Sequence, residues 1–352
     1  MKKLLIATAA LAMVAGTAQA QSSVTVYGVL DMGYSNVESK ATTGVTTETK
    51  TTGAEGQASG NRLGFRGVED LGGGLKANFV LEWSHTPSET GAAVGANNRQ
   101  SFVGLSGAFG EASIGRMNTL HKYIQDNNTF GGPSFTTGWT AAMNGYNAER
   151  ISNVIQYKTP TISGLSATVQ LVDNASDVSN VAGENISGSG MAAMINYKAG
   201  KFELAYANGA VKDTLNSATP AVTTETATEN KRKIDSVLAT YDFGVAKAFL
   251  VSTKAKVEVT GAAVNAESED TTIGVRVPMG KFALLAQYGE GEQTAASTGA
   301  KTDTEGYQLG VQYSLSKRTT AYAYYGDQES KAVGAATAAT ADGYTIGIRH
   351  SF

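Results

Sequence analysis

A strict two-residue alternation of apolar and polar side chains is the feature that most constrains the fold of this chain. Between positions 75 and 84, apolar residues occupy every second position, while Lys76 and Glu82 lie on the opposite face of the same extended segment. Sixteen segments show this period, and no long segment shows the period of a helix. We therefore expect β-strands at approximately 22–36, 59–69, 74–85, 98–107, 110–117, 150–158, 164–174, 189–198, 201–209, 232–243, 245–258, 270–278, 281–290, 304–315, 319–329 and 341–352.

The connections between these segments alternate between short and long. The short ones are rich in glycine or proline, which supply turn conformations, and lie at 70–74, 107–110, 160–164, 199–200, 242–244, 278–280 and 316–319. The long ones are polar and lie at 37–58, 86–97, 118–149, 175–188, 210–231, 259–269, 291–303 and 330–340. One end of the sheet therefore carries tight turns and the other carries long loops. A β-sandwich would mix its connections, and a solenoid would repeat one length.

The polar face of these strands decides what covers the apolar face. It carries charges such as Lys76, Glu82 and Arg349, which a packed protein interior would exclude. The alternative is an apolar face toward lipid, where every backbone group must pair and the sheet must close. Strands of about ten residues, an even strand number, short turns and long loops are typical of such barrels, and sixteen strands leave an aqueous channel. The sequence therefore predicts an all-β, 16-stranded antiparallel transmembrane β-barrel with short periplasmic turns and long outer loops.

Aromatic residues near the ends of the segments agree with this interpretation. Outer-membrane barrels carry girdles of aromatic side chains at both membrane interfaces. We expect the girdles to include Tyr27, Tyr34, Trp83, Tyr157, Tyr206, Tyr241, Tyr288, Tyr313 and Tyr344.

Composition excludes several other classes of protein. No run of apolar residues in 21–352 is longer than five, which excludes a helical membrane protein. The chain has no Cys, which excludes a disulfide scaffold and a thiol catalyst. Its three His lack the spacing of a metal site, so we expect no metal and no cofactor.

The first twenty residues have the three parts of a bacterial export signal. Lys2 and Lys3 precede an apolar stretch at 4–14, and Ala18-Gln19-Ala20 fits a cleavage site. The apolar stretch is too short to be a membrane anchor. We expect residues 1–20 to be a signal peptide of the Sec route, removed to leave one domain at 21–352. The remaining 26 basic and 31 acidic residues give a net charge of −5, which excludes a generic nucleic-acid binder.

Several short motifs, taken in order, resemble those of a known family. They are 23–28 (SVTVYG), 61–72 (NRLGFRGVEDLG), 102–105 (FVGL), Phe109-Gly110 leading to Gly115-Arg116, Tyr157 with Pro160, and the final Phe352. Together they resemble the general porins of Gram-negative bacteria, specifically the β-proteobacterial type, over the whole of 21–352. The resemblance implies a homotrimer of porin β-barrels in the outer membrane, among lipid and lipopolysaccharide. Each barrel would hold a water-filled pore for passive diffusion of ions and small hydrophilic solutes.

The resemblance also implies roles for the C-terminal strand and the third long loop. The alternation from Tyr344 to Phe352 fits the family's signal for the barrel assembly machinery. The third loop, 118–149, is expected to fold into the pore and narrow it. A Pro-Glu-Phe-Gly sequence found in some members is absent, and Gly132-Pro133-Ser134-Phe135 is the nearest. The expected constriction residues of this loop are Asp126, Glu149, Tyr123, Phe135 and Trp139.

Arginines recur at equivalent places opposite that loop. Arg62, Arg99 and Arg150 each begin a strand that descends from the outer face, and alternate strands lie roughly 10 Å apart. They would form a positive ladder on one wall of the pore, which Arg66, Arg116 and Lys76 would extend. Arg116 has the parity of Ile114, so it joins the ladder only if the strand carries a bulge. We expect Asp31 and Glu82 to lie lower in the pore.

A ladder of fixed positive charge favours anions, so we expect weak anion selectivity. The alternatives are a solute-specific porin for small organic anions, an exported β-rich surface adhesin, and a barrel enzyme. The last would need a nucleophile or acid–base cluster at one rim, and the sequence has none, so we expect no enzymatic activity.

Overall fold

The described part of the chain forms seventeen strands and one helix. The computed structural model describes residues 23–55, 58–85, 98–126, 149–175, 185–216, 228–259, 264–296 and 298–352. The expected signal peptide, Phe135 and Trp139 lie outside these ranges. The first elements are β1 (Ser23–Lys40), β2 (Thr46–Glu55), β3 (Arg62–Gly72), β4 (Leu75–Ser84), β5 (Asn98–Gly107), β6 (Gly110–Asn118), α2 (Leu120–Asp126), β7 (Arg150–Lys158) and β8 (Leu165–Ala175). The others are β9 (Asn185–Ala199), β10 (Phe202–Asn216), β11 (Thr228–Asp242), β12 (Lys247–Val259), β13 (Ala266–Met279), β14 (Phe282–Thr294), β15 (Lys301–Ser314), β16 (Thr319–Ala332) and β17 (Ala339–Ser351).

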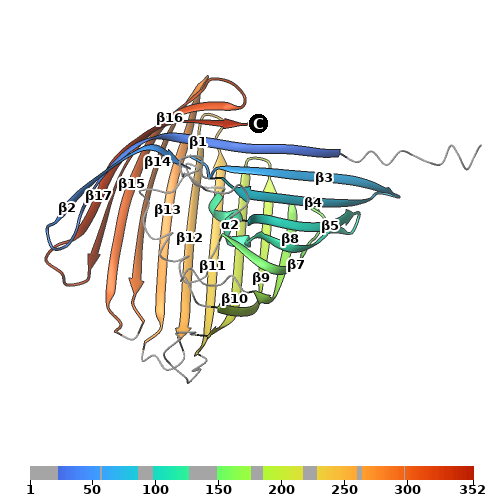
Figure 1. Ribbon diagram of the computed structural model, residues 1–352, viewed down its shortest axis with the longest axis horizontal. Helices are drawn as coiled ribbons and strands as arrows, with labels where there is room; N and C mark the ends of the chain where they lie inside the picture. The colour runs from blue at the N-terminus through green and yellow to red at the C-terminus, as the bar shows by residue number, and fades with distance from the viewer. Residues whose placement is uncertain are drawn as a thin grey trace, which may run out of the picture.

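The strands form one closed antiparallel sheet in which β1 pairs with β17 (Figure 1). β2 and β3 occupy a single position of the barrel, because both pair with the same edge of β1. β3 pairs with residues 23–29 and β2 with residues 32–40. The seventeen strands therefore fill sixteen positions, and the predicted 16-stranded antiparallel barrel is confirmed.

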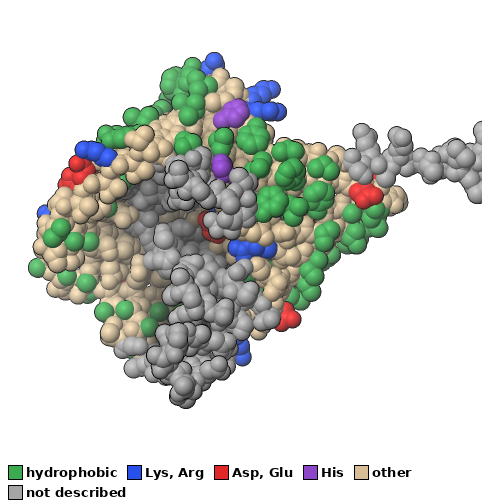
Figure 2. Space-filling model, in the orientation of Figure 1, with side chains coloured by type: hydrophobic (Ala, Val, Ile, Leu, Met, Phe, Trp, Pro, Cys, Tyr) green, Lys and Arg blue, Asp and Glu red, His purple; other side chains and the backbone are tan. Residues whose placement is uncertain are grey.

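Burial in this barrel is the reverse of burial in a water-soluble protein. The outward faces carry exposed apolar side chains such as Ile195, Leu309 and Ile346, which are 50 to 58% exposed. The inward faces bury polar side chains such as Gln170 and Gln308. Figure 2 shows hydrophobic side chains spread over the outer surface of the wall. An apolar exterior around a polar interior is the arrangement that lipid requires.

The strands from β9 to β17 extend further toward the outer end than the sequence analysis expected. Parts of the expected long loops, including 210–216, 266–269 and 291–294, are strand, and 46–55 forms β2. Beyond the membrane both faces of a strand are solvated, so the two-residue hydrophobic period disappears although backbone pairing continues. Cross-strand ion pairs accompany the pairing there, such as Lys254 Nζ to Glu269 Oε1 at 2.7 Å.

The short connections are tight turns, as predicted. Between β3 and β4 the three consecutive glycines Gly72, Gly73 and Gly74 all have positive φ, from 60 to 86°. Residues with a Cβ rarely adopt this conformation, which explains the glycine run.

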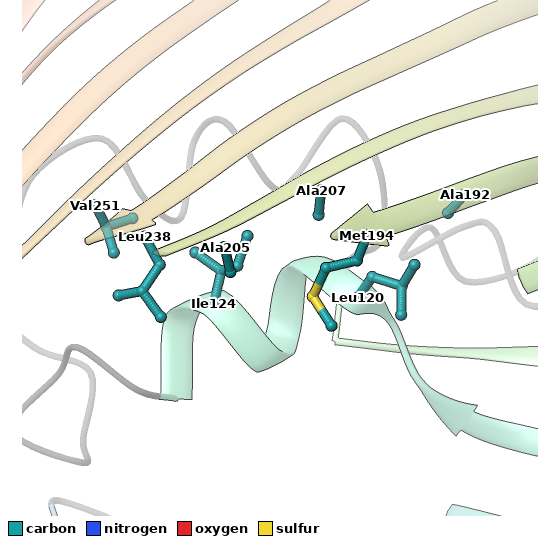
Figure 3. Packing of buried hydrophobic residues seen from close by; sticks show 8 residues of the cluster. All are labelled: Leu120, Ile124, Ala192, Met194, Ala205, Ala207, Leu238 and Val251. Atoms are coloured by element: carbon teal, nitrogen blue, oxygen red, sulfur yellow. The ribbon is translucent and has the colours of Figure 1, made fainter. Parts of the chain in front are cut away.

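The helix α2 lies inside the barrel, at the start of the third long connection (Figure 3). Leu120 and Ile124 are buried in a cluster with the inward-facing residues Ala205, Ala207 and Leu238 of β10 and β11. The hydroxyl of Thr119 accepts a hydrogen bond from the Lys122 amide at 3.2 Å and caps the helix. The described start of the third connection, α2, therefore lies inside the pore as predicted. No helix among the described residues is both long and apolar enough to cross a membrane.

Candidate functional site

Glu82 on β4 is the centre of a charged cluster on the inner wall. Its carboxylate accepts hydrogen bonds from Arg99 Nε of β5 at 2.6 Å and from the Tyr27 hydroxyl of β1 at 3.0 Å. Arg62 Nε of β3 lies 3.9 Å from it. The Glu82 side chain is only 6% exposed, so these cations compensate a charge that is shielded from water. Three strands thus place side chains on the carboxylate of a fourth.

Of the two inner carboxylates, only Asp31 departs from its predicted depth. Glu82 lies opposite Gly64, two positions below Arg62 as predicted, and its side chain reaches the arginines. Asp31 was expected lower in the pore, yet the register pairs Val29 with Arg62. Because β1 ascends, Asp31 lies two positions above Arg62. The parity of a residue gives its face but not its depth, which depends on the register of its partner strand.

Tyr27 points into the pore, and its assignment to the aromatic girdle was wrong. Its ring crosses Gly64, where an added Cβ would lie 2.6 Å from the ring carbon Cζ. The guanidinium carbon of Arg66 lies 5.2 Å from the ring centroid, a cation–π distance. Tyr27 has the parity of Thr25 rather than that of Val24, which was the sequence signal for its inward direction.

A second cluster joins α2 to the start of β7. Arg150 Nη2 lies 2.7 Å from Glu149 Oε2, and Lys122 Nζ lies 2.6 Å from Asp126 Oδ1 and 3.4 Å from Glu149 Oε1. Burial raises the pKa of Glu149, but the charges of Lys122, Arg150 and Arg99 outweigh it and hold that pKa below the usual value. Glu149 therefore stays ionised at neutral pH. The field of Arg99 reaches this carboxyl, so the two clusters are electrostatically continuous.

The bulge that the Arg116 prediction required is present in β6. The pairing with β7 shifts between Gly115 and Met117. Arg116 Nε donates to the Asn98 carbonyl and Nη1 donates to Ser152 Oγ, both at 2.9 Å. Arg116 thereby joins β6 to β5 and β7. Its partners Asn98 and Ser152 lie within two positions of Arg99 and Arg150 in the sequence.

Lys76 lies apart from these clusters. It is opposite Asp70 and Ser106, near the periplasmic turns. Six positions separate it from Glu82, or about 20 Å along the strand.

Two residues of α2 fix the helix to the opposite wall. The hydroxyl of Tyr123 donates to Glu203 Oε1 at 2.6 Å, and burial together with this carboxylate raises the pKa of Tyr123 to about 12. His121 is fully buried, with Nδ1 3.0 Å from Ser236 Oγ. Burial lowers the pKa of His121 to about 4, so its ring is neutral at pH 7. Sequence reasoning considered His121 only as a metal ligand and missed this packing role.

The C-terminal residue completes the closure of the barrel. Phe352 exchanges two backbone hydrogen bonds with Gly28, each 3.1 Å long. Tyr344 faces outward, 41% exposed, with its ring 6.2 Å from that of Tyr34.

Among the groups that form the ion pairs of these two clusters, positive groups outnumber negative groups by one. The negative groups are Glu82, Glu149 and Asp126, and the positive groups are Arg62, Arg99, Arg150 and Lys122. A narrow passage with a positive excess lowers the energy of an anion relative to a cation.

Known proteins are similar to this chain both in sequence and in fold. The family model described as "Gram-negative porin" matches residues 7–333. Outer membrane porin protein 32 of Delftia acidovorans is 33% identical over 340 residues, which cover 92% of this chain and 88% of that protein. Major outer membrane protein P.IB of Neisseria meningitidis serogroup B is 31% identical over 325 residues, 91% of each chain.

Solved structures share the complete barrel. The anion-selective porin from Comamonas acidovorans has a TM-score of 0.73 and 26% identity, covering 94% of this chain and all of that one. A trimer form of OmpT from Vibrio cholerae has a TM-score of 0.69 at 17% identity, covering 94% of this chain and 99% of that one. At that identity the likeness extends to the fold alone.

Proposed function

Because this chain belongs to the Gram-negative porin family, we propose that it forms a weakly anion-selective diffusion channel whose preference is set by the arginines beside α2. The protein is an outer-membrane porin of Gram-negative bacteria, a transmembrane β-barrel channel without enzymatic activity. Ions and small hydrophilic solutes cross it without a chemical step. Size exclusion and electrostatic bias at the narrow part of the pore discriminate between them.

One observation carries this proposal: the positive excess where α2 faces the inner wall of β3–β7. The guanidinium groups of Arg62, Arg99 and Arg150 stay charged at any working pH. Glu82 and Glu149 hold them in place but neutralise them only in part. The anion selectivity named for the similar Comamonas porin supports the same sign.

Reversal potentials across a salt gradient in a planar bilayer test the proposal. We expect the potential of the native channel to be that of weak anion preference, and the double variant Arg62→Ala/Arg99→Ala to move it toward cations. Lys317→Ala, which removes an exposed charge from a periplasmic turn, is the matched control and should leave the potential unchanged. A cation-selective native channel that the double variant leaves unchanged contradicts the proposal. Competitive block of the current by one organic anion would instead assign a solute-specific porin.

We also infer a homotrimer that contacts outer-membrane lipid and lipopolysaccharide through its apolar exterior. The family is typically trimeric, and one similar structure is a trimer form. We assign to Phe352 and Tyr344 the signal for the barrel assembly machinery. Deletion of Phe352 should reduce the amount of heat-modifiable trimer on SDS gels, whereas Phe109→Ala, which changes an exposed phenylalanine of a periplasmic turn, should not.

A further inference from the structure

A short segment between β2 and β3 leaves the wall and enters the pore. The pairing of β1 with β3 ends at Val29 opposite Arg62, and its pairing with β2 begins at Met32 opposite Glu55. Two residues of β1 therefore stand opposite six residues of the neighbouring chain, 56–61. Of these, the described residues 58–61 form what we call the inner segment. Ala58 is 1% exposed and packs in a cluster with Tyr322 and Tyr324, which point inward.

The carboxylate of Asp31 holds the inner segment by its backbone. Oδ2 accepts hydrogen bonds from the amides of Ala58 and Ser59, both at 2.6 Å. The Asp31 amide in turn donates to Asn61 Oδ1. Asp31 is completely buried, so its contacts are with protein groups rather than with the open pore. Hydrogen bonds to an ionised acceptor are about twice as strong as neutral ones.

The other oxygen of Asp31 is fixed by the opposite side of the barrel seam. Oδ1 accepts from the hydroxyl of Tyr322, whose ring crosses Gly347. Tyr322 stacks on Tyr324 at a centroid distance of 4.7 Å, and Gln312 Nε2 donates to the Tyr324 hydroxyl at 2.7 Å. Asp31 is therefore held by side chains of β16 and β15, and it in turn holds the inner segment.

The far side of the inner segment touches the basic cluster. Arg62 Nη1 donates to the Gly60 carbonyl at 3.2 Å. An added Cβ at Gly60 would lie 3.3 Å from Arg99 Nη1, so the segment packs against that guanidinium as well. Residues 58–61 thus connect Asp31 on one side with two arginines of the candidate constriction on the other.

We propose that Asp31 is a positioning residue of the pore, whose carboxylate holds residues 58–61 against Arg62 and Arg99 and thereby fixes the width of the passage. The role of the two arginines rests on the proposed function, but the holding of the segment does not. An alanine at position 31 has no acceptor oxygen, so it cannot reproduce these contacts. The released segment loses its fixed place, and Arg62 loses its carbonyl partner.

Asp31→Ala tests the proposal by single-channel conductance in 1 M KCl. At that salt the Debye length is about 3 Å, so the mere loss of a charge is screened while a change of shape is not. We expect a conductance that differs from the native value and a broader distribution of levels. Asp270→Ala, which also removes a buried inward-facing carboxyl group, is the matched control and should keep the native conductance.

A thiol reporter separates positioning from general stability. The native chain has no Cys, so Ser59→Cys gives a single labelling site in the inner segment. We expect a several-fold faster reaction with a polar thiol reagent when Asp31→Ala is added, at unchanged heat stability of the trimer. This result does not depend on ion selectivity, so it stands or falls separately from the proposed function.

Tyr322→Phe keeps the test decisive if Asp31→Ala does not assemble. It removes one of the three hydrogen bonds to the carboxylate and should accelerate labelling of Ser59→Cys to a smaller extent. Native conductance together with a native labelling rate in an assembled variant overturns the proposal.

Discussion

Two regions of the inner wall use the same arrangement of side chains for different purposes. Around Glu82 and around Asp31, a tyrosine of one strand crosses a glycine of the next and donates its hydroxyl to a carboxylate one strand further on. At Glu82 the remaining partners are arginine side chains, whereas at Asp31 they are backbone amides. The carboxylate of Glu82 therefore positions charged side chains, and that of Asp31 positions a backbone segment. The comparison teaches that a buried acid in a pore wall can act on permeation without facing a permeating ion.

Among the variants that test this comparison, the largest effect on stability is expected from the loss of Glu82. Glu82→Ala leaves Arg99 and Arg62 without their carboxylate, and loss of one member of a buried pair costs about 3 to 5 kcal/mol of stability. The variant should lower the thermal midpoint of the trimer and move the reversal potential further toward anions.

The isosteric variant Glu82→Gln serves as the control for volume. If it changes the conductance in 1 M KCl more than the reversal potential, Glu82 acts by shape, as we propose for Asp31, and the distinction between the two regions is lost.

The docking of α2 involves neither Glu82 nor Asp31, so it serves as a reference for the two regions. Burial lowers the pKa of His121 from 6.5 to about 4, and the carboxylate of Asp235 opposes this shift. The unfolded state therefore binds more protons between those values, and roughly 3 kcal/mol of stability is lost as the pH falls through that window. A spin label at Gln125→Cys should become mobile as the pH falls from 6.5 toward 4.

His121→Gln removes the titrating group and should abolish this mobility change. Glu149 acts in a different window: its lowered pKa gives stability that is present above 4.5 and lost only at more acidic pH. Label mobility that persists in His121→Gln would show that another group controls the docking of α2.

Gly64 and Gly347 allow a direct comparison of the two tyrosine crossings. An added Cβ would lie 2.6 Å from the Tyr27 ring at Gly64 and 2.3 Å from the Tyr322 hydroxyl at Gly347. Alanine at either site should cost about 1 to 3 kcal/mol by overpacking, measured by denaturant unfolding in detergent.

A double variant in which the crossing tyrosine is also changed to alanine should lose less than the sum of the two single effects. Additive effects would mean that the glycine and the tyrosine at that site are independent.

The smallest expected effect is the loss of one hydroxyl. Tyr27→Phe removes a hydrogen bond to Glu82 but leaves Arg99 paired with the carboxylate, so it should cost about 1 kcal/mol of unfolding free energy or less. The same measurement on Tyr322→Phe sharpens the comparison: only this variant should also change labelling at Ser59→Cys.

The sequence predicted the barrel well because one physical rule governs every strand. Lipid outside and water inside impose a two-residue period, and residues such as Ile346 and Gln308 follow it. The same rule placed Arg62, Arg99 and Arg150 on one wall, because each stands at the start of an alternate strand.

The contacts within the site could not be predicted in the same way. The period gives the face of Glu82 but not which side chains reach it, since the bulge between Glu82 and Trp83 shifts the register there. Residues 58–61 and α2 lie between strands. Neither the alternation that lipid imposes nor the backbone hydrogen bonds between strands determine their conformation. The docking of His121 depends on Ser236, 115 positions away, which no local pattern connects to it.

The two hydrogen bonds between Gly28 and Phe352 also determine when the barrel can close. They join residue 28 to residue 352, so the ring cannot close before both segments have been made. Apart from β1 and β3, between which β2 lies, the other neighbouring pairs of described strands are consecutive in sequence. This seam must instead bring together residues about 320 positions apart, at an entropic cost of about 5 kcal/mol for a flexible loop. Until then β1 and β17 are free edges, and free edges pair with whatever strand they meet. The sheet therefore stays open to pairing with other chains until this seam forms.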